Sequence, residues 1–246
     1  MIKRFRIVYL IPLLILLMSA NNGLAQNKKT VPKKNVAASN KSSKVMLAKV
    51  KPGPICIRIT TDSGVMVIKL SDSTPLHRNN FVKLVKEGFY DSLLFHRVIP
   101  QFMIQGGDPT SKYAATGERL GNGGDTMARI PAEFNPSLYH KKGVLAAARD
   151  GNPAKASSAC QFYLVEGKIF TDEQLNMLEQ QKGFKYTLEQ REMYKTVGGT
   201  AHLDGAYTVF GEVETGLEVI SKIAGVPKDA ANRPLGDIRM KMEIIK

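Results

Sequence analysis

The stretch from Leu94 to Pro109, LFHRVIPQFMIQGGDP, constrains the fold of this chain more than any other. Before its closing turn it holds a single fully charged side chain, Arg97, in a largely apolar run. Phe95, Arg97 and Ile99 alternate with their neighbours at the period of two that is typical of a β-strand. Pro100 cannot donate a hydrogen bond to a strand partner, so the chain should bend there and return. The stretch therefore predicts a β-hairpin.

The register of this hairpin would bring polar and apolar side chains together. A bend centred on Gln101 places Arg97 opposite Gln105. It also places Ile99 opposite Met103, and opposite residues lie about 5 Å apart on one face of a sheet. The ordinary interpretation of Arg97 is a surface arginine whose stem lies along apolar neighbours. The functional one is a guanidinium held over an apolar platform, with the glutamine fixing its fork, as an uncharged ligand with a carbonyl and an apolar ring would require.

The first 25 of the 246 residues have the pattern of a secretory signal peptide. Three basic residues within the first six precede the apolar run 7–18, and small residues at 23–25 give a cleavage site. The alternative is an uncleaved membrane anchor, but a run of 12 residues that includes Pro12 is shorter than the ~20 needed to span a bilayer. We therefore expect an exported protein, periplasmic or secreted, with no stable membrane anchor after cleavage.

Residues 26–51 have the composition of a flexible basic linker before a folded domain over 52–246. The linker holds eight lysines with no acidic and no aromatic residue, so it lacks the apolar surface that folding requires. The first 51 residues supply 11 of the 13 net positive charges of the chain. A basic tail can bind nucleic acid or an anionic membrane, but a solvated tether is the commoner case. Because the domain has no nucleic-acid-binding motif, we expect no nucleic-acid partner.

The remaining periodicity predicts a mainly β domain with short strands, turns rich in glycine, and two helices. This pattern favours a closed barrel or a sandwich. Thr74-Pro75 should cap and begin the first helix, which Gly88 ends. His77 is expected to be a solvated or capping side chain near the start of that helix. Besides the hairpin, the predicted strands are 55–61, 65–70, 143–149, 161–165, 208–213 and 238–245, and the second helix is 216–224.

A second region, about 166–199, has the pattern of a helical insertion. Thr171 and Thr187 are each followed three residues later by a glutamine, as in a capping box. Gly183 and Gly198 are the matching stops, so the sequence predicts helices at 172–182 and 188–197. This insertion could contact a substrate or partner, or it could be a loop decoration without a chemical role.

The sequence gives only weak indications of a disulfide, a metal site or another catalytic motif. Cys56 and Cys160 could pair in an exported protein, but both lie in or beside apolar runs, where cysteine is usually a small buried side chain. The four histidines have no metal-ligand spacing, and no Ser-His-Asp pattern, nucleophile elbow or Walker motif is present, so we predict no metal and no cofactor. The Gly-rich run 121–124 lacks the Lys-Ser/Thr of a phosphate loop and is expected to be a surface loop.

FHRVIPQFMIQGGDP resembles the signature of the cyclophilin-type peptidyl-prolyl cis-trans isomerases. The resemblance covers residues 54–246 apart from the insertion. It implies a closed eight-stranded antiparallel barrel capped by two helices, and an enzyme that isomerises X–Pro bonds in proline-containing polypeptides. A monomer without a cofactor is expected. The alternatives are a non-catalytic peptide-binding module or holdase on the same fold, and an assembly protein that acts through its tail and insertion.

The same resemblance assigns roles to individual residues. The catalytic arginine falls on Arg97, and the glutamine that orients it falls on Gln105. Tyr163 and Tyr207 replace a Phe and a His of the best-known eukaryotic members, and His202 replaces a Trp that contacts cyclosporin, so tight binding of that drug is not expected. The implied substrate-binding residues are Phe102, Met103, Ala148, Arg149, Gln161, Tyr163, Leu203 and Tyr207.

Rotation about a peptide bond meets a barrier of about 18–20 kcal/mol because the C–N bond is partly double. A catalyst of this rotation needs no nucleophile, metal or proton shuttle. It must stabilise a twisted amide, and a fixed guanidinium beside an apolar proline pocket would do so. The absence of other catalytic motifs therefore agrees with the isomerase prediction.

Overall fold

The computed structural model describes residues 53–245, which contain eight β-strands and four α-helices. The strands are β1 (Cys56–Thr61), β2 (Gly64–Leu70), β3 (Phe95–Ile99), β4 (Met103–Gly106), β5 (Val144–Ala147), β6 (Phe162–Val165), β7 (Val209–Thr215) and β8 (Lys241–Ile244). The helices are α1 (Pro75–Lys86), α2 (Asp172–Lys182), α3 (Leu188–Thr196) and α4 (Leu217–Ala224), with two short 3-10 helices, η1 (Pro109–Tyr113) and η2 (Ala201–Leu203).

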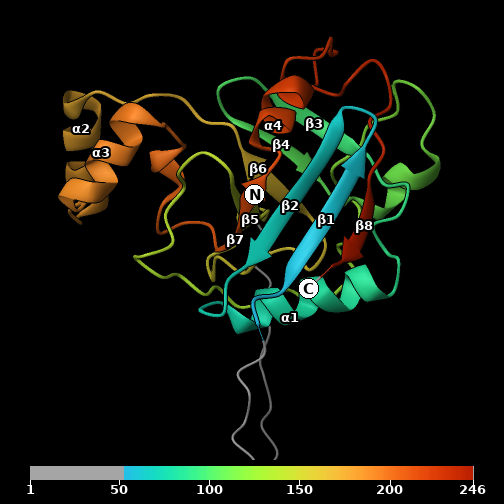
Figure 1. The fold of residues 1–246 in the computed structure, drawn as a ribbon, viewed down its shortest axis with the longest axis horizontal. Coiled ribbons are helices and arrows are strands. Elements are labelled where there is room, and N and C mark those ends of the chain that lie inside the picture. The colour runs from blue at the N-terminus through green and yellow to red at the C-terminus, as the bar shows by residue number, and fades with distance from the viewer. Residues whose placement is uncertain (1–52, 246) are drawn as a thin grey trace, which may run out of the picture. The chain divides into compact units, whose positions relative to one another are not determined.

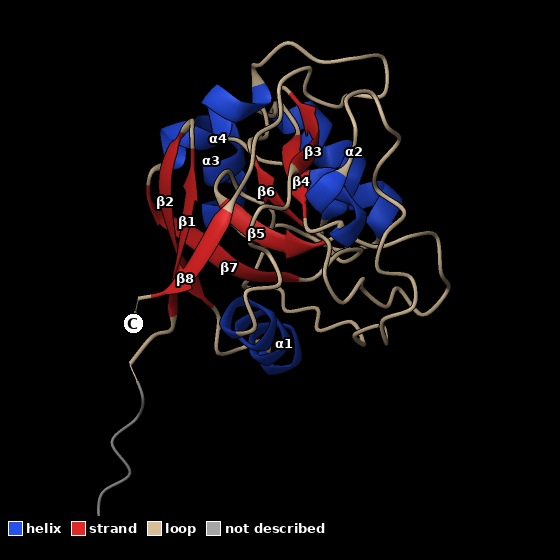
Figure 2. Cartoon of the chain, turned by 90° about the vertical axis from the view of Figure 1, so that its right-hand side faces the viewer, coloured by secondary structure: helices blue, strands red, loops and turns tan. Residues whose placement is uncertain are grey.

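The eight strands form one antiparallel sheet in the order β3-β4-β6-β5-β7-β2-β1-β8. The sheet curls on itself (Figure 2), and its edges meet just before β3 and β8, where Phe95 N donates to Ile238 O and Met240 N donates to Leu93 O. Helices α1 and α4 lie at opposite ends of the curled sheet (Figure 1). The predicted eight-stranded antiparallel architecture with two capping helices is confirmed, although short flanking segments rather than a full β3–β8 ladder join the edges.

The main hydrophobic core lies inside the curled sheet and under the two capping helices. Alternate residues of β1, Ile57 and Ile59, are completely buried, as the period of two requires. From α1, Phe81 packs into the same cluster, and from α4 so do Ile220 and Ile223. Each such side chain stabilises the fold by about 1.5–3 kcal/mol through burial, so the helices are held mainly by their apolar faces.

The start of α1 differs from the prediction. Thr74 occupies the N-cap position, but its side chain makes no capping hydrogen bond. The carboxylate of Glu133 caps the helix instead, because it accepts from Leu76 N and His77 N at 3.0 Å each. His77 is buried rather than solvated, with Nδ1 2.7 Å from Glu133 and Nε2 2.9 Å from Ser157 Oγ. A loop far along the chain thus supplies the cap, and no local pattern near His77 encodes it.

The inserted helices lie where the capping boxes predicted them. Both boxes form, with Thr171 Oγ1 accepting from Gln174 N and Thr187 Oγ1 accepting from Gln190 N. Gly183 ends α2 in the left-handed conformation at φ +71°, which costs glycine little. Helix α3 ends one residue earlier than predicted, and β5 and β8 are shorter than their apolar runs because backbone pairing stops before the apolar pattern does.

The predicted signal peptide, the linker and the two cysteines remain to be compared with the described residues. The predicted signal peptide (1–25) and linker (26–51) lie outside the described residues. Within residues 53–245, no helix is both long and apolar enough to cross a membrane. Cys56 and Cys160 are both buried, as predicted for small core side chains, and Cys160 is a free thiol whose sulfur lies 3.8 Å from Ser158 Oγ.

Candidate active site

The β3–β4 hairpin has the predicted register, with Arg97 opposite Gln105 and Ile99 opposite Met103. Gln101 lies in the turn between the two strands with a positive φ of 59°. Arg97 is half-buried, and its NH1 donates to Gln105 Oε1 at 3.2 Å. The guanidinium is therefore fixed by a side chain of the same sheet face, as the functional interpretation of Arg97 requires, and its catalytic role stays a prediction.

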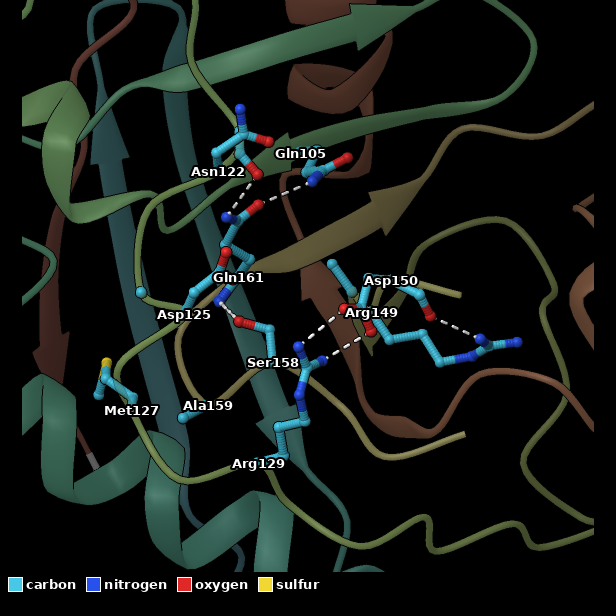
Figure 3. A pocket seen from close by; sticks show the side chains of 13 residues that line it. Gln105, Asn122, Asp125, Met127, Arg129, Arg149, Asp150, Ser158, Ala159 and Gln161 are labelled. Atoms are coloured by element: carbon cyan, nitrogen blue, oxygen red, sulfur yellow. Dashed lines mark hydrogen bonds and ion pairs between the residues drawn. The ribbon is translucent and has the colours of Figure 1, made fainter. Parts of the chain in front are cut away.

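A chain of side-chain amides continues from Gln105. Gln105 Nε2 donates to Gln161 Oε1 at 3.0 Å (Figure 3). Gln161 Nε2 donates to the carbonyl oxygens of Gly121 and Gly123 at 2.9 Å each. Carbonyl oxygens only accept, so the two amides can have only one orientation. The carbonyl oxygen of Gln105 must consequently face Arg97, and this fixes the direction of the guanidinium.

The loop 121–123 is in turn anchored by Asp108, which is completely buried. The Asp108 carboxylate accepts hydrogen bonds from the backbone N–H groups of Gly121, Gly123 and Thr110. Burial by itself would raise the pKa of Asp108, but these hydrogen bonds outweigh it and lower the pKa below its usual value. The Gly-rich run is therefore more than the surface loop that its sequence suggested, because it holds the far end of the amide chain.

His96 precedes Arg97 in β3 and is only 4% exposed. Neither of its ring nitrogens has a hydrogen-bond partner. The pKa of His96 is lowered to about 4, mainly by burial; the positive charges of Arg97 and Arg233 act in the same direction, and the negative charge of Asp108 opposes the shift. His96 is thus a neutral, apolar-like neighbour of the candidate catalytic arginine at neutral pH.

A cavity of about 180 Å³ opens beside the guanidinium of Arg97. Six of its nine lining residues are apolar or aromatic, and the other three carry a guanidinium or an amide, which suits an apolar ring next to an amide. All nine lining residues were predicted as site residues. The lining consists of Arg97, Phe102, Met103, Gln105, Ala148, Arg149, Tyr163, Leu203 and Tyr207.

Tyr163 forms part of this lining while its hydroxyl is bonded behind the pocket. The side chain is 4% exposed, and the hydroxyl oxygen lies 2.9 Å from His140 Nε2. Burial raises the pKa of Tyr163 well above its ordinary value, and the nearby Tyr207 and Asp204 add to the shift. The extra hydroxyl of Tyr163, which stands where the best-known eukaryotic members have a phenylalanine, thus has its partner outside the cavity. The Tyr163 ring remains part of the cavity lining.

Arg149 and Tyr207 close another side of the cavity as a pair. The guanidinium carbon of Arg149 lies 4.5 Å from the centre of the Tyr207 ring, a cation–π geometry. Arg149 Nε donates to Ala206 O and its NH1 donates to Asp150 O, both at 2.8 Å. Arg149 therefore serves as a fixed wall. His202, which does not line the cavity, stacks on the lining residue Phe102 with ring centres 5.6 Å apart.

A second cavity of about 200 Å³ adjoins the first (Figure 3). Gln161 lines this cavity and not the first one, where it contacts Gln105 from behind; its predicted role in substrate binding stays a prediction. Arg129 and Asp150 form a bidentate salt bridge at its rim, with two N–O distances of 2.7 Å. Loop 121–124 supplies the opposite rim.

The sequence analysis did not identify the residues behind the pocket. His140 lies in a loop, and Asp204 follows the short helix η2; neither residue stands in a motif with a recognised chemistry. Both are buried and hydrogen-bonded to each other, with His140 Nδ1 2.7 Å from Asp204 Oδ1. Their separation by 64 positions in the chain left no local signal that could have paired them.

Residues 56–244 match the family described as cyclophilin type peptidyl-prolyl cis-trans isomerase/CLD. This chain belongs to that family, so the predicted family is confirmed. A Streptococcus pyogenes protein named for both phosphatase and peptidyl-prolyl cis-trans isomerase activity is 35% identical over 187 residues, 74% of this chain and 37% of that protein. The chain therefore spans little more than a third of that relative's length.

Two further comparisons agree. A Staphylococcus aureus protein named for peptidyl-prolyl cis-trans isomerase activity is 33% identical over 192 residues, 77% of this chain and 90% of that protein. A crystal structure of a Cryptosporidium parvum cyclophilin type isomerase superposes with a TM-score of 0.57 at 26% identity, over 78% of this chain and 98% of that one. Another structure of the Cryptosporidium protein, with the same TM-score, was obtained in the presence of the dipeptide Ala-Pro.

Proposed function

We propose that this chain catalyses cis–trans isomerisation of X–Pro bonds in exported polypeptides and so assists their folding. The observation that carries the proposal is the guanidinium of Arg97, held by Gln105 at the edge of an apolar cavity. Membership of the isomerase family supports the reaction class. The Ala-Pro dipeptide used with the Cryptosporidium relative supports a proline-containing peptide as the ligand class.

The geometry suits the rotation of a prolyl amide. Met103, Tyr163 and Leu203 would hold the proline ring, while the carbonyl that precedes it rotates beside Arg97. In the twisted state the amide loses resonance and its nitrogen becomes pyramidal, so a nearby donor stabilises it more than it stabilises the planar ground state. Because the amide chain already fixes the guanidinium, little reorganisation is needed when the bond twists.

Export is supported by the sequence alone. The basic start, the apolar run 7–18 and the small residues at 23–25 have the order of a secretory signal peptide. An exported isomerase would meet newly translocated chains, in which X–Pro bonds exchange over tens to hundreds of seconds. We therefore propose a periplasmic or secreted location and a role in folding, and expect the purified mature chain to lack residues 1–25 by mass spectrometry.

The first experiment is a proline-isomerisation assay on an X–Pro peptide with the full chain and its Arg97→Ala variant. The wild type should accelerate exchange, and the variant should lose about 100-fold or more in kcat/KM, the usual consequence of removing one fixed transition-state donor. Thermal unfolding should show the variant folded, because Arg97 is half-buried and lies outside the main core.

The assay also separates the alternative function. If wild type and Arg97→Ala both leave the uncatalysed rate unchanged, the isomerase proposal fails. Binding of the same peptide without acceleration would then identify a peptide-binding module or holdase on this fold.

A further inference from the structure

A buried polar chain connects the helical insertion to the floor of the proline pocket. In α3, the Tyr194 hydroxyl donates to Asp204 Oδ2 at 2.5 Å. Asp204 Oδ1 lies 2.7 Å from His140 Nδ1, and His140 Nε2 lies 2.9 Å from the Tyr163 hydroxyl. All four side chains are at most 8% exposed. The chain of hydrogen bonds therefore joins helix α3 of the insertion to a ring that lines the cavity.

The Asp204 carboxylate at the centre holds both of its neighbours. It accepts from the Tyr194 hydroxyl through Oδ2, and through Oδ1 it accepts from the backbone N–H of His140 at 2.8 Å. Asp204 Oδ1 also lies 2.7 Å from His140 Nδ1, so the imidazole is held by its backbone and by its ring. The position of Nε2 against the Tyr163 hydroxyl is thereby set from Asp204.

The backbone at the base of the insertion makes the same connection rigid. Lys168 and Gly199, at the two ends of the insertion, exchange hydrogen bonds of 3.0 and 2.9 Å. Thr200 N donates to His140 O at 2.8 Å, and Lys182 of α2 donates to the backbone oxygen of Asp204. The insertion is thus closed at its base against the loop that holds His140.

The insertion also has a small aromatic core of its own that holds Tyr194. The Tyr194 ring is completely buried and makes edge-on contacts with Tyr139, Phe170 and Tyr186, with ring centres 5.5 to 5.7 Å apart. The helix pair α2–α3 lies beside the barrel (Figure 1). Because the ring is fixed by packing, the hydroxyl is a fixed donor rather than a mobile one.

We propose that Tyr194 is a positioning residue for the isomerase, which holds the Tyr163 ring of the proline pocket through Asp204 and His140. This inference rests on the proposed function and makes the insertion part of the substrate-binding apparatus. It decides between the two interpretations of the insertion that its sequence left open, a substrate-related role and a loop decoration. Tyr194 itself touches no substrate, because it is buried behind the pocket.

The test is a double-mutant cycle on Tyr194→Phe and Tyr163→Phe in the full chain, with steady-state kinetics on an X–Pro peptide. Each substitution keeps its ring and removes only a hydroxyl. Tyr194→Phe should raise KM about fivefold and change kcat less than twofold, because the floor grips the proline ring in ground and transition states alike. In the Tyr163→Phe background, which has lost the link, Tyr194→Phe should change KM no further.

The matched control is Tyr90→Phe, which also removes a hydroxyl bonded in a buried site, to Cys160 O at 3.2 Å, but which has no hydrogen bond to this chain of residues. It should lower stability without changing KM. The inference is overturned if Tyr194→Phe leaves KM unchanged, if it raises KM equally in both backgrounds, or if Tyr90→Phe raises KM as much. If the wild type is inactive, the proposed function has failed separately, and the same cycle is measured on the dissociation constant of the peptide.

Discussion

Two sides of the cavity beside Arg97, its hairpin wall and its floor, each have a buried histidine behind them. The two histidines differ in their hydrogen bonding. On the hairpin wall, His96 is next to Arg97 in sequence, and neither ring nitrogen has a partner. On the floor, His140 is 1% exposed, and both ring nitrogens are hydrogen-bonded, to Asp204 and to Tyr163. One histidine acts as a space-filling group and the other as a link in a polar chain.

This contrast follows from how each wall is built. The Arg97 wall is a hairpin of neighbouring residues whose register places the functional groups, so His96 has only to fill space. The floor is assembled from β6, η2 and a loop, which are distant in sequence, and polar contacts have to hold them together. The hairpin wall should therefore tolerate the loss of His96, whereas the floor should not tolerate the loss of His140.

The largest effect should come from His140→Leu. The substitution removes the ring partner of the buried Asp204 carboxylate and the partner of the buried Tyr163 hydroxyl. Each buried polar group that loses its partner costs roughly 1–3 kcal/mol. Denaturant unfolding measures the loss, and a change below about 1 kcal/mol would show that the floor does not depend on this contact.

His96→Leu should be nearly neutral at pH 7, because it removes two ring nitrogens that have no partners. Its effect should appear in acid. The folded pKa of His96, about 4, lies below the ordinary value of about 6.5, so the unfolded state takes up the proton first. The stability that neutral His96 contributes is complete above pH 6.5 and is lost as the pH falls towards 4.

The size of this acid effect is about 3 kcal/mol, from the difference between the two pKa values. Unfolding free energies of wild type and His96→Leu at pH 7, 5.5 and 4.5 provide the measurement. The difference between the proteins isolates His96, because the lowered pKa values of His77 and His202 affect both alike. Parallel pH profiles for the two proteins would contradict the burial of an unpartnered imidazole.

The smallest effect should come from Gln161→Leu on the hairpin wall. The substitution leaves Arg97 and Gln105 in place but removes the amide that orients Gln105. We expect kcat/KM to fall about tenfold, equivalent to about 1.4 kcal/mol, mainly through kcat, because the transition-state donor is less well fixed. The control is Gln180→Leu, the same substitution at an exposed position of α2 that has no contact with Gln105. Equal rates for the two variants would show that Gln105 needs no support.

Local patterns were sufficient for much of the fold. Strand periodicity and Pro100 gave the hairpin and the pairing of Arg97 with Gln105, because register depends on residues only a few positions apart. The capping boxes at Thr171 and Thr187 gave the inserted helices for the same reason. Prediction failed at α1, where the cap came from Glu133 rather than from Thr74, since 57 positions separate that carboxylate from Leu76.

The pocket residues outside the hairpin were predicted from the resemblance to a family. Only the structure gave their positions relative to one another. The sequence by itself determined which segments become strands and helices, because a residue's period and caps are set by its neighbours along the chain. Only the tertiary structure decided that Tyr194, Asp204, His140 and Tyr163 form one chain. Hydrogen bonds between such distant residues require atoms within about 3 Å, and only the completed fold brings them that close.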